Sequence, residues 1–353
     1  MADMFDIFNP PKTKVVKGVA GKMLLVHSQS VKCGKTTVGS QMPKPFYLRF
    51  EQGANFIDGM PYAPLKSWSD FKQVAKNLAS DKRKKVIIDG VEKEVCPRDL
   101  YDTLIPDTFD VAIRWCKDYV CKKYGVEKLG DGNNGYGLWQ EYADEWFNTW
   151  NPLMNAGYFI YGISHSEIRK IKDGRTGEEV EKYAPKGDKR TIDLIIETVD
   201  FIGYVKSNGV DEEGNVIPSS IYLAETDEYL AGSRLDTMPS EIKVFSAENI
   251  QNAIKEAIEK KESQSGNAAI SYEEKKIEEV QKEWTHKEIL DAIKPYLQTL
   301  WEKYAEDVTD IMTNNLGEDV KITDTTKKQI PQLEMVLFDL KNLAKDKGVS
   351  VNV

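Results

Sequence analysis

The amino-acid sequence predicts an α/β fold with a mostly parallel sheet, followed by a C-terminal helical region. The first observation is a short apolar run, "MLLVH" at 23–27, which Gly34-Lys35-Thr36 follows. The second is the alternation of strand-like and helix-like segments up to about residue 262, which is typical of parallel α/β sheets. The third is the purely helical periodicity of residues 272–349.

Composition is compatible with a large globular core. The chain has 353 residues, of which 41% are hydrophobic, so one large domain with an appendage or two domains are expected. No run of eighteen apolar residues and no apolar N-terminal stretch occur, so neither a membrane span nor a secretory signal is expected, and the predicted location is the cytoplasm. The four cysteines form no Cys-x-x-Cys pair and are expected to be free thiols.

The net charge of −9 argues against a protein whose whole surface binds nucleic acid. It leaves room for a local basic strip, because phosphate contacts need only a few Lys and Arg side chains in one place.

The strands of the core are predicted from short apolar runs bounded by turn residues. They are expected at 23–27, 44–53, 101–110, 158–167, 199–207 and 219–226. The helices are predicted from apolar residues spaced three and four apart. They are expected at 67–82, with Ser69 as the N-cap, and at 111–126, 136–157 and 247–262.

Two further segments set the domain organisation. Asp89-Gly90 stands between the matched runs "KKVII" and "VEKEV" and predicts a tight hairpin over 84–95. The small polar segment 263–271 predicts a linker. The predicted domains are therefore an α/β core at 1–262, the linker at 263–271 and a helical region at 272–353. In that last region Pro295 is expected to mark a kink or boundary, and Trp284 and Trp301 to lie in the core.

A phosphate-binding loop is predicted at the end of the first strand. The stretch "HSQSVKCGKTT" has the second half of the pattern G-x-x-x-x-G-K-[ST], but Gln29 occupies the position of the first Gly. Gln29 must adopt an ordinary φ or carry strain of roughly 1–3 kcal/mol. The residues expected to contact ATP are Ser30, Val31, Lys32, Cys33, Gly34, Lys35, Thr36 and Thr37.

The loop chemistry assigns two of these side chains. Lys35 is expected to meet the β- and γ-phosphates, and the Thr36 hydroxyl to bind Mg²⁺. A carboxylate at the end of a neighbouring strand completes such a site. Asp107 and Asp89 compete for this role: Asp107 is favoured because a helix follows it directly, although Pro106 cannot donate to a sheet ladder, whereas Asp89 is explained by the hairpin.

The order of several short segments carries a family resemblance. After the loop come "FYLRFEQGANFID", "TLIPDTFD", "GYFIYGISHSE", "YAPKGDKR", "VDFIGYV" and "AGSRLDTMP". Over roughly residues 15–260 this order resembles the phage nucleotide-binding ATPases of the RecA-like P-loop class. That group includes RecA-core single-strand annealing and recombination proteins.

The resemblance implies further roles. Glu51 matches the carboxylate that activates the attacking water, and Asp107 the metal-side carboxylate. His165 matches the polar sensor of the γ-phosphate. Arg234 could reach the nucleotide of a neighbouring subunit as an arginine finger. Without the resemblance, Glu51 is a surface residue at a strand end and His165 a structural histidine.

The resemblance also implies a DNA-contacting loop after His165. The segment 168–190 carries an excess of basic residues, and those predicted to bind DNA are Arg169, Lys170, Lys172, Arg175, Lys186, Lys189 and Arg190. Tyr183 could stack on a base. The equally weighted alternative is a solvated β-hairpin that turns at Asp173-Gly174.

The implied function is a phage ATPase with ATP and Mg²⁺ as cofactors, active in recombination, annealing or as a replication accessory. The implied partners are single-stranded DNA, further copies of the chain in a ring or filament, and phage replication or recombination proteins, and no membrane is implied. Gln29 and Pro106 both fall at the nucleotide site, so slow hydrolysis is expected. The alternative is a nucleotide-binding structural or assembly scaffold that does not hydrolyse ATP.

Overall fold

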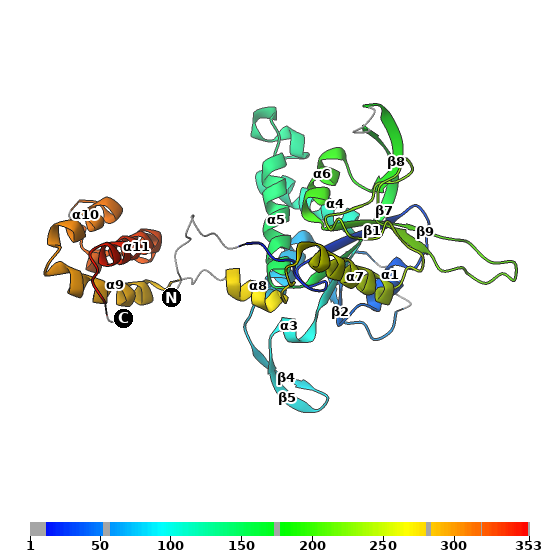
Figure 1. The fold of residues 1–353 in the computed structure, drawn as a ribbon. Helices are drawn as coiled ribbons and strands as arrows, with labels where there is room; N and C mark the ends of the chain where they lie inside the picture. The colour runs from blue at the N-terminus through cyan, green and yellow to red at the C-terminus, as the bar shows by residue number, and fades with distance from the viewer. Residues whose placement is uncertain (1–11, 52–56, 173–176, 280–283, 319, 352–353) are drawn as a thin grey trace. The chain divides into compact units, whose positions relative to one another are not determined.

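The computed structural model describes residues 12–51, 57–172, 177–279, 284–318 and 320–351. They divide into two compact units, residues 14–275 and a smaller helical unit from Lys276 onward (Figure 1). Within these residues no helix is both long enough and apolar enough to cross a bilayer.

The strands that the structure describes belong to the larger unit. They are β1 Met23–Ser28, β2 Pro45–Arg49, β3 Tyr62–Pro64, β4 Lys84–Ile88, β5 Val91–Val95, β6 Thr103–Asp107, β7 Phe159–Lys172, β8 Glu179–Pro185, β9 Phe201–Lys206, β10 Ser220–Tyr222, β11 Gly232–Ser233 and β12 Glu241–Ile242. Its helices are α1 Lys35–Ser40, α2 Trp68–Leu78, α3 Pro97–Leu100, α4 Phe109–Tyr124, α5 Trp139–Asn155, α6 Lys189–Thr198 and α7 Ala247–Ser265, with α8 Tyr272–Glu279 at the boundary.

One mixed sheet forms the centre of the larger unit. Its order is β12-β10-β9-β1-β7-β6-β2-β3, with β8 paired to β7 and β11 paired to β9. The six strands from β9 to β3 in this order are parallel, and the additions at β10, β12, β11 and β8 are antiparallel. The predicted α/β fold with a mostly parallel sheet is therefore confirmed.

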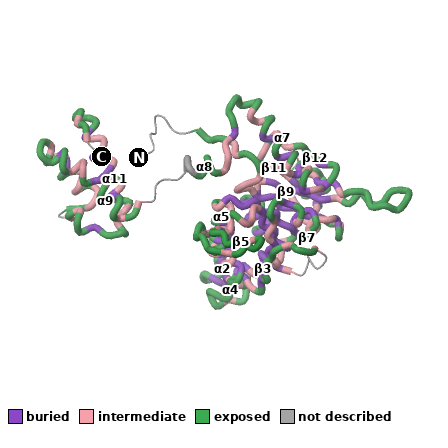
Figure 2. The backbone as a smooth tube through the Cα atoms, turned by 90° about the horizontal axis from the view of Figure 1, so that it is seen from below, coloured by how far each residue is buried: buried purple, intermediate pink, exposed green. Residues whose placement is uncertain are grey.

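Helices cover both faces of this sheet, which explains why its central strands carry buried, mainly apolar runs (Figure 2). Side chains of α2, α4, α5 and α6 share a core with one face, in which Trp68 stacks on Trp146 with ring centroids 5.7 Å apart. Side chains of α1 and α7 pack on the other face. All six residues of β1 are buried.

Most predicted elements are present with small shifts in their ends. The strands predicted at 23–27, 44–53, 101–110, 158–167, 199–207 and 219–226 correspond to β1, β2, β6, β7, β9 and β10, and the hairpin at Asp89-Gly90 is β4–β5. The N-cap of α2 is Ser67, whose hydroxyl accepts from the Asp70 amide, and not Ser69. Pro106 lies inside the sheet opposite Leu48, not at a sheet edge.

The charged segment 168–190 is more regular than its composition suggested. β7 continues to Lys172 and pairs with β8 from Ser166–Pro185 to Lys172–Glu179, and α6 follows. This is the hairpin weighed as the alternative for that segment. The Asp173-Gly174 turn itself lies outside the described residues.

The predicted linker 263–271 lies within the larger unit. Residues up to Ser265 complete α7, and Ile270 pairs with Val16, so the backbone of this segment is hydrogen-bonded rather than free. The Tyr272 hydroxyl donates to the Met154 carbonyl at 2.8 Å, which fixes the start of α8 on the core. The small, polar composition of this segment predicted a linker, because the sequence alone does not show the contacts that hold the segment to the larger unit.

The second unit is built from α9 His286–Trp301, α10 Ala305–Leu316 and α11 Ile330–Asp346. Its core includes Ile289, Leu300 and Leu337. α9 runs through Pro295, so this proline is not a boundary. Trp284 packs against the core as predicted, but Trp301 is 52% exposed, and the expectation that it lies in the core is wrong.

Candidate active site

The parallel strands end together and place the predicted site residues along one edge of the sheet. The register aligns Val26 of β1 with Ile163 of β7, Ile163 with Asp107 of β6, and Asp107 with Arg49 of β2. The residues that follow these positions therefore meet at the carboxyl edge, which is where open α/β sheets bind ligands.

The phosphate loop connects β1 to α1 and is the most distinctive backbone feature of this edge. Positive φ angles occur at Lys32 (58°) and Gly34 (88°), and not at Gln29. A Cβ placed on Gly34 would meet no atom within 4 Å, so φ, and not lack of space, favours glycine there. Gln29 thus takes an ordinary φ, and the strain considered for it does not arise.

The loop is held in place through its carbonyl groups. The Ser219 hydroxyl donates to the Cys33 carbonyl at 3.2 Å, and the Tyr161 hydroxyl donates to the Lys35 carbonyl at 3.0 Å. The Ser28 hydroxyl donates to the Ser30 carbonyl at 3.0 Å. These contacts hold the loop through its carbonyls, and the loop amides are the groups expected to donate to an anion.

Thr36 and Asp107 form the centre of the site. The Thr36 hydroxyl donates to Asp107 Oδ2 at 2.9 Å, and the Tyr47 hydroxyl donates to the same oxygen at 3.1 Å. Asp107 is 2% exposed, and burial raises the pKa of its carboxyl group, against the lowering effect of these two hydroxyls and Lys35. Asp89, the competing carboxylate, is exposed at the tip of the β4–β5 hairpin.

Glu51 lies directly beside this pair. Its amide donates to the Asp107 carbonyl at 3.0 Å, because the chain leaving β2 crosses the end of β6. Burial raises the pKa of the Glu51 carboxyl group, and the Asp107 charge adds to the effect while His165 opposes it. Glu51, Asp107 and His165 therefore lie close enough to influence one another electrostatically.

His165 is paired with a carboxylate that sequence reasoning did not single out. Its Nδ1 lies 3.2 Å from both carboxylate oxygens of Asp110, in the first turn of α4. This hydrogen bond is the main reason that the pKa of His165 is raised. Burial opposes ionisation of Asp110, but the bond to His165 prevails and lowers the pKa of that carboxyl group.

An NMR titration is expected to separate the imidazoles of His27 and His165. His27 is fully buried, and burial lowers its pKa to about 4, whereas the pKa of His165 lies above that of an ordinary histidine. In Asp110→Asn the pKa of His165 should fall, because the paired charge is gone. An unchanged His165 pKa in this variant would contradict the pairing.

The same pair sets a pH window for stability. The contribution of His165 is fully present below about pH 6.5, the value of a free histidine, and is lost as pH rises through its raised folded pKa. The contribution of Asp110 is present above about pH 4 and is lost as pH falls through its lowered folded pKa. The stability cost of Asp110→Asn should therefore be largest between these limits.

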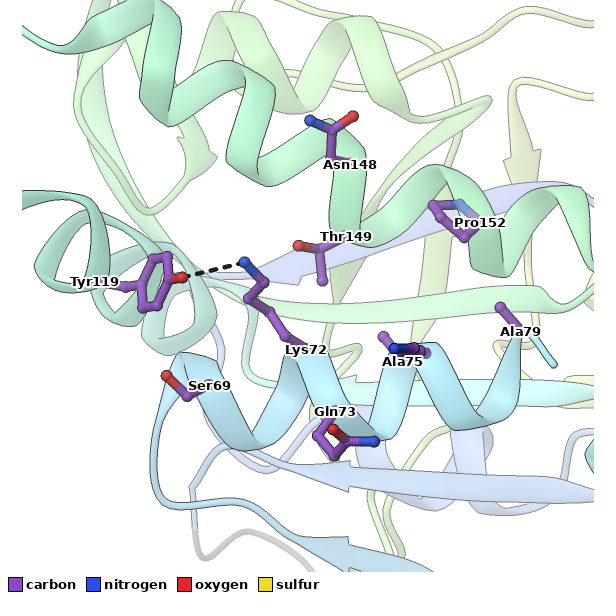
Figure 3. A pocket seen from close by; sticks show the side chains of 10 residues that line it. Ser69, Lys72, Gln73, Ala75, Ala79, Tyr119, Asn148, Thr149 and Pro152 are labelled. Atoms are coloured by element: carbon purple, nitrogen blue, oxygen red, sulfur yellow. Dashed lines mark hydrogen bonds between the residues drawn. The ribbon is translucent and has the colours of Figure 1, made fainter. Parts of the chain in front are cut away.

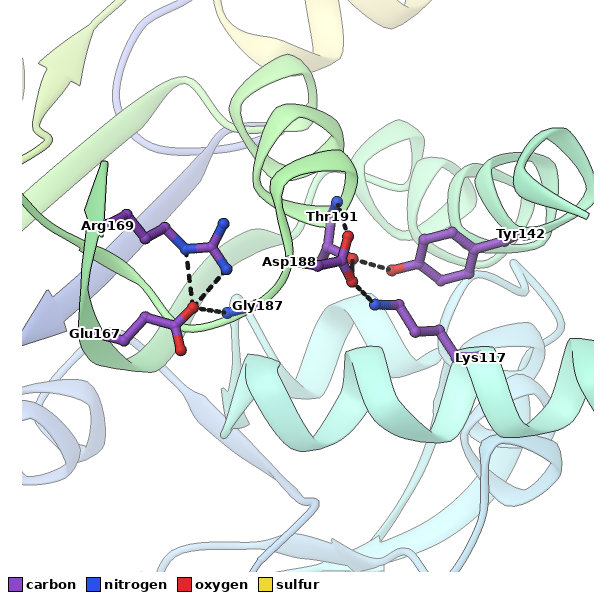
Figure 4. A network of polar contacts seen from close by, with 7 residues as sticks. All are labelled: Lys117, Tyr142, Glu167, Arg169, Gly187, Asp188 and Thr191. Atoms are coloured by element: carbon purple, nitrogen blue, oxygen red, sulfur yellow. Dashed lines mark hydrogen bonds and ion pairs between the residues drawn. The ribbon is translucent and has the colours of Figure 1, made fainter. Parts of the chain in front are cut away.

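The β7–β8 hairpin begins at Ser166, the residue after His165 in the site. The Lys186 amide donates to the His165 carbonyl at 2.8 Å, so His165 forms the base of the hairpin. Figure 4 shows how that base is fixed: Glu167 accepts from Arg169 and from the Gly187 amide, and Asp188 accepts from Lys117 of α4. α4 thus contacts the hairpin base through an ion pair at each of two positions, one at His165 and one at Asp188.

The residues predicted to bind DNA differ in the exposure of their side chains and in their contacts within the chain. Lys170, Lys186 and Lys189 are exposed. Arg169 has only 18% of its side chain exposed and is committed to Glu167, and Arg190 lies over the Trp139 ring at 4.2 Å. The side chain of Lys172 and all of Arg175 lie outside the described residues.

Tyr183 is not a free stacking surface. Its ring is parallel to that of Tyr204, with centroids 6.1 Å apart, and Tyr204 stacks in turn on Tyr229 at 4.4 Å. The tyrosines join β8 to β9 and to the segment before β11, so the notion that Tyr183 stacks on a base has no support in this geometry.

Arg234 lies at the opposite edge of the sheet from the phosphate loop of its own chain. It follows β11, which pairs with the first residues of β9, and it contacts Asp200 at 3.6 Å and the Glu197 carbonyl. Its own nucleotide site is therefore out of reach, which leaves only the predicted contact with a neighbouring subunit.

A hollow on the described surface is separate from this site. It has a volume of about 520 Å³ and lies between α2, α4 and α5, where Lys72 donates to the Tyr119 hydroxyl at 3.2 Å (Figure 3). The phosphate loop contributes nothing to its lining, and α1 packs on the other face of the sheet.

Sequence reasoning missed the residues that act as partners. Tyr47, Asp110 and Tyr161 support the site through hydrogen bonds to Asp107, His165 and the phosphate loop. Asp110 had a usable signal, since it stands three residues after Asp107 in the first helical turn. The two tyrosines lie on strands whose apolar pattern gave no reason to separate them from the core.

The donor set suits Mg²⁺ bound together with a nucleotide. No cluster of three or more His, Cys, Asp and Glu side chains forms a complete metal site within the described chain. A hydroxyl and a carboxylate 2.9 Å apart, Thr36 and Asp107, are the oxygen donors that Mg²⁺ uses when phosphates and water fill its other positions.

The comparisons with known proteins agree with this geometry. A model of the AAA domain family matches residues 22–235, a range that contains all the predicted site residues. The chain is also similar to the SPbeta prophage-derived uncharacterized protein YorG of Bacillus subtilis (strain 168). The two are 38% identical over 339 residues, which cover 96% of this chain and 98% of that protein.

Proposed function

The chain belongs to the AAA domain family of P-loop ATPases, and we propose that it hydrolyses ATP at the carboxyl edge of its sheet and couples hydrolysis to single-stranded DNA. The observation that carries the proposal is the Thr36 hydroxyl on the buried Asp107 carboxylate, with Glu51 alongside. The similarity to a prophage-derived protein supports a phage origin, in keeping with recombination, annealing or replication-accessory work in the host cytoplasm.

Binding of the nucleotide uses the phosphate loop. Its amides and the Lys35 ammonium group surround the phosphates, and Thr36 with Asp107 holds Mg²⁺. Mg²⁺ held there would supply positive charge against the phosphates. Lys35 adds to this stabilisation as negative charge develops in the transition state.

Activation of water falls to Glu51. Its raised pKa makes it a stronger base than an exposed glutamate, and it follows the end of β2 immediately beside Asp107. His165, held by Asp110, presents an imidazole where the parallel pairing of β7 with β1 ends, as the group that senses the γ-phosphate. How readily this imidazole is protonated depends on the charge of the groups that it faces.

Coupling to DNA runs through the β7–β8 hairpin. The His165 carbonyl accepts from the Lys186 amide at the hairpin base, and Nδ1 of His27 on β1 lies 2.8 Å from the hydroxyl oxygen of Ser166, the next residue along β7. A change in either contact moves the exposed lysines, which are the groups that would bind phosphates of the single strand. Membership of the RecA-like class, and an oligomer in which Arg234 acts between subunits, are part of this proposal.

Charge reversal of the hairpin lysines tests the DNA part of the proposal. Lys170→Glu/Lys186→Glu should lower affinity for an oligonucleotide and reduce the salt dependence of binding, by about 0.7 in the log–log slope for each phosphate that is no longer neutralised. The measurement is fluorescence anisotropy with labelled single-stranded DNA over a series of salt concentrations.

The matched control is Lys122→Glu/Lys123→Glu, at the exposed end of α4. It reverses the same number of charges and should change affinity little. Equal reductions in affinity in the two variants would mean that binding follows net charge and not the hairpin. If the wild type binds no oligonucleotide at low salt, with or without ATP, the DNA part is wrong.

A further inference from the structure

Two ribbons project from the larger unit, and neither belongs to its hydrophobic core. The first is the β4–β5 hairpin at 84–95, which pairs with no other strand that the structure describes. The second is the segment 208–217 beyond β9, called here the acidic ribbon, in which Val210 pairs with Val216 (Figure 1). An isolated two-stranded ribbon is marginal in water, so each is expected to gain from a partner.

One face of the β4–β5 hairpin is apolar and positively charged. Strand register places Val86, Ile88, Val91 and Val95 on this face together with Lys84 and Lys93, and it is called here the lysine–valine face. Val91 is 56% exposed, and none of these side chains is part of a described hydrophobic cluster. The two lysines form no ion pair within the described residues.

The opposite face of the hairpin differs. It carries Lys85, Ile87, Glu92 and Glu94, and Lys85 forms an ion pair with Glu92 at 3.2 Å. Its positive charge is therefore balanced inside the chain, and only the lysine–valine face carries an unmatched positive charge. This difference gives a control within the same hairpin.

The acidic ribbon has the complementary chemistry. Val210 is 60% exposed and its cross-strand partner Val216 is 79% exposed. Asp211, Glu212 and Glu213 form the tip, and residues 207–219 contain no Lys or Arg. Asp211 is used inside the turn, since it accepts from the Asn215 amide at 2.7 Å, but Glu212 has no partner among the described residues.

We propose that the lysine–valine face of one subunit binds the acidic ribbon of a second copy of this chain. Exposed β-branched side chains stand on both partners and the charges are opposite, so a contact would bury the valines and pair Lys84 and Lys93 with Glu212 and Glu213. The two surfaces are different, so the contact is head-to-tail and generates a ring or a filament. This inference rests on the proposed function insofar as that function uses an oligomer.

Charge exchange tests the contact directly. Lys84→Glu/Lys93→Glu and Glu212→Lys/Glu213→Lys should each reduce the mass measured by light scattering from a multiple of 40.1 kDa to that of the monomer. Each variant then has two like-charged surfaces. In an equimolar mixture each variant can bind the other, because every contact then joins oppositely charged surfaces, so the oligomer should return. A chain with all four substitutions has one surface of each charge and should assemble by itself.

Controls separate this contact from folding, nucleotide binding and DNA. Glu92→Lys/Glu94→Lys, on the opposite face of the hairpin, should not lower the mass. All variants should keep the wild-type thermal unfolding midpoint and the wild-type affinity for a fluorescent ATP analogue, which tests the nucleotide site independently.

Three outcomes overturn the inference. One is a wild-type protein that is monomeric with and without Mg·ATP, another is an oligomer that survives either double reversal, and the third is a mixture that stays monomeric. If Lys84→Glu/Lys93→Glu keeps its mass but loses affinity for single-stranded DNA, the face binds nucleic acid and not a second subunit.

Discussion

Lys35→Ala is expected to reduce ATP turnover by on the order of 10²–10³-fold and to weaken ATP binding, because the Lys35 ammonium group stabilises charge on the transferred phosphoryl group. Lys35 is the first residue of α1 and has its Nζ 3.7 Å from Cys33 Sγ in the loop. The measurements are phosphate release at saturating Mg·ATP and titration with a fluorescent ATP analogue.

Lys32→Ala is the matched control for this experiment. Lys32 is in the same loop and is exposed, and its backbone is already at a positive φ of 58° that alanine tolerates no worse. The proposed contact of Lys32 with the phosphates is through its backbone amide, which alanine keeps, so turnover should change little. Equal turnover by Lys35→Ala and the wild type would show that hydrolysis does not use this loop.

Glu51→Gln is expected to abolish most turnover while Mg·ATP still binds. General-base catalysis contributes about 10²–10⁴-fold, and the amide keeps the size of the side chain but cannot accept the proton. Burial and the Asp107 charge raise the pKa of Glu51, so wild-type turnover should fall as pH drops through that raised value. The residual activity of Glu51→Gln should not show this acid limb.

Asp58→Asn is a suitable control, since Asp58 is an exposed carboxylate a few residues farther along the same connection and lies outside the site. It should retain both the rate and the pH profile. Full turnover in Glu51→Gln, or an unchanged acid limb, would remove Glu51 from the mechanism and leave another group to activate water.

The central strands were predictable because burial on both faces forces apolar runs. β1, β6 and β7 carry such runs, and the residues that end them include Asp107 and His165. Parallel strands align their carboxyl ends, so residues at successive strand ends could be grouped from sequence alone. The fold class and the place of Asp107 rest on this regularity, whereas the roles of Glu51 and His165 were implied by the family resemblance.

The remaining features depend on contacts between distant parts of the chain. β8 and α6 fall in a charged segment. Its exposed lysines and glutamates obscure the pattern of apolar residues that would predict a strand and a helix, although α6 buries Ile192 and Ile195. The role of Asp110, on α4, is apparent only from its 3.2 Å contact with His165 on β7. Gln29 was an objection because it replaces the first Gly of the pattern, and the backbone shows that the positive φ angles of the loop lie at Lys32 and Gly34 instead.

The central claim is that a nucleotide site at this edge is coupled to the β7–β8 hairpin. The most direct test is the rate of phosphate release by the wild-type protein with Mg·ATP, measured with and without single-stranded DNA. The proposed coupling predicts slow release that rises when DNA is added. No release in either condition would contradict hydrolysis, and release that DNA leaves unchanged would contradict the coupling.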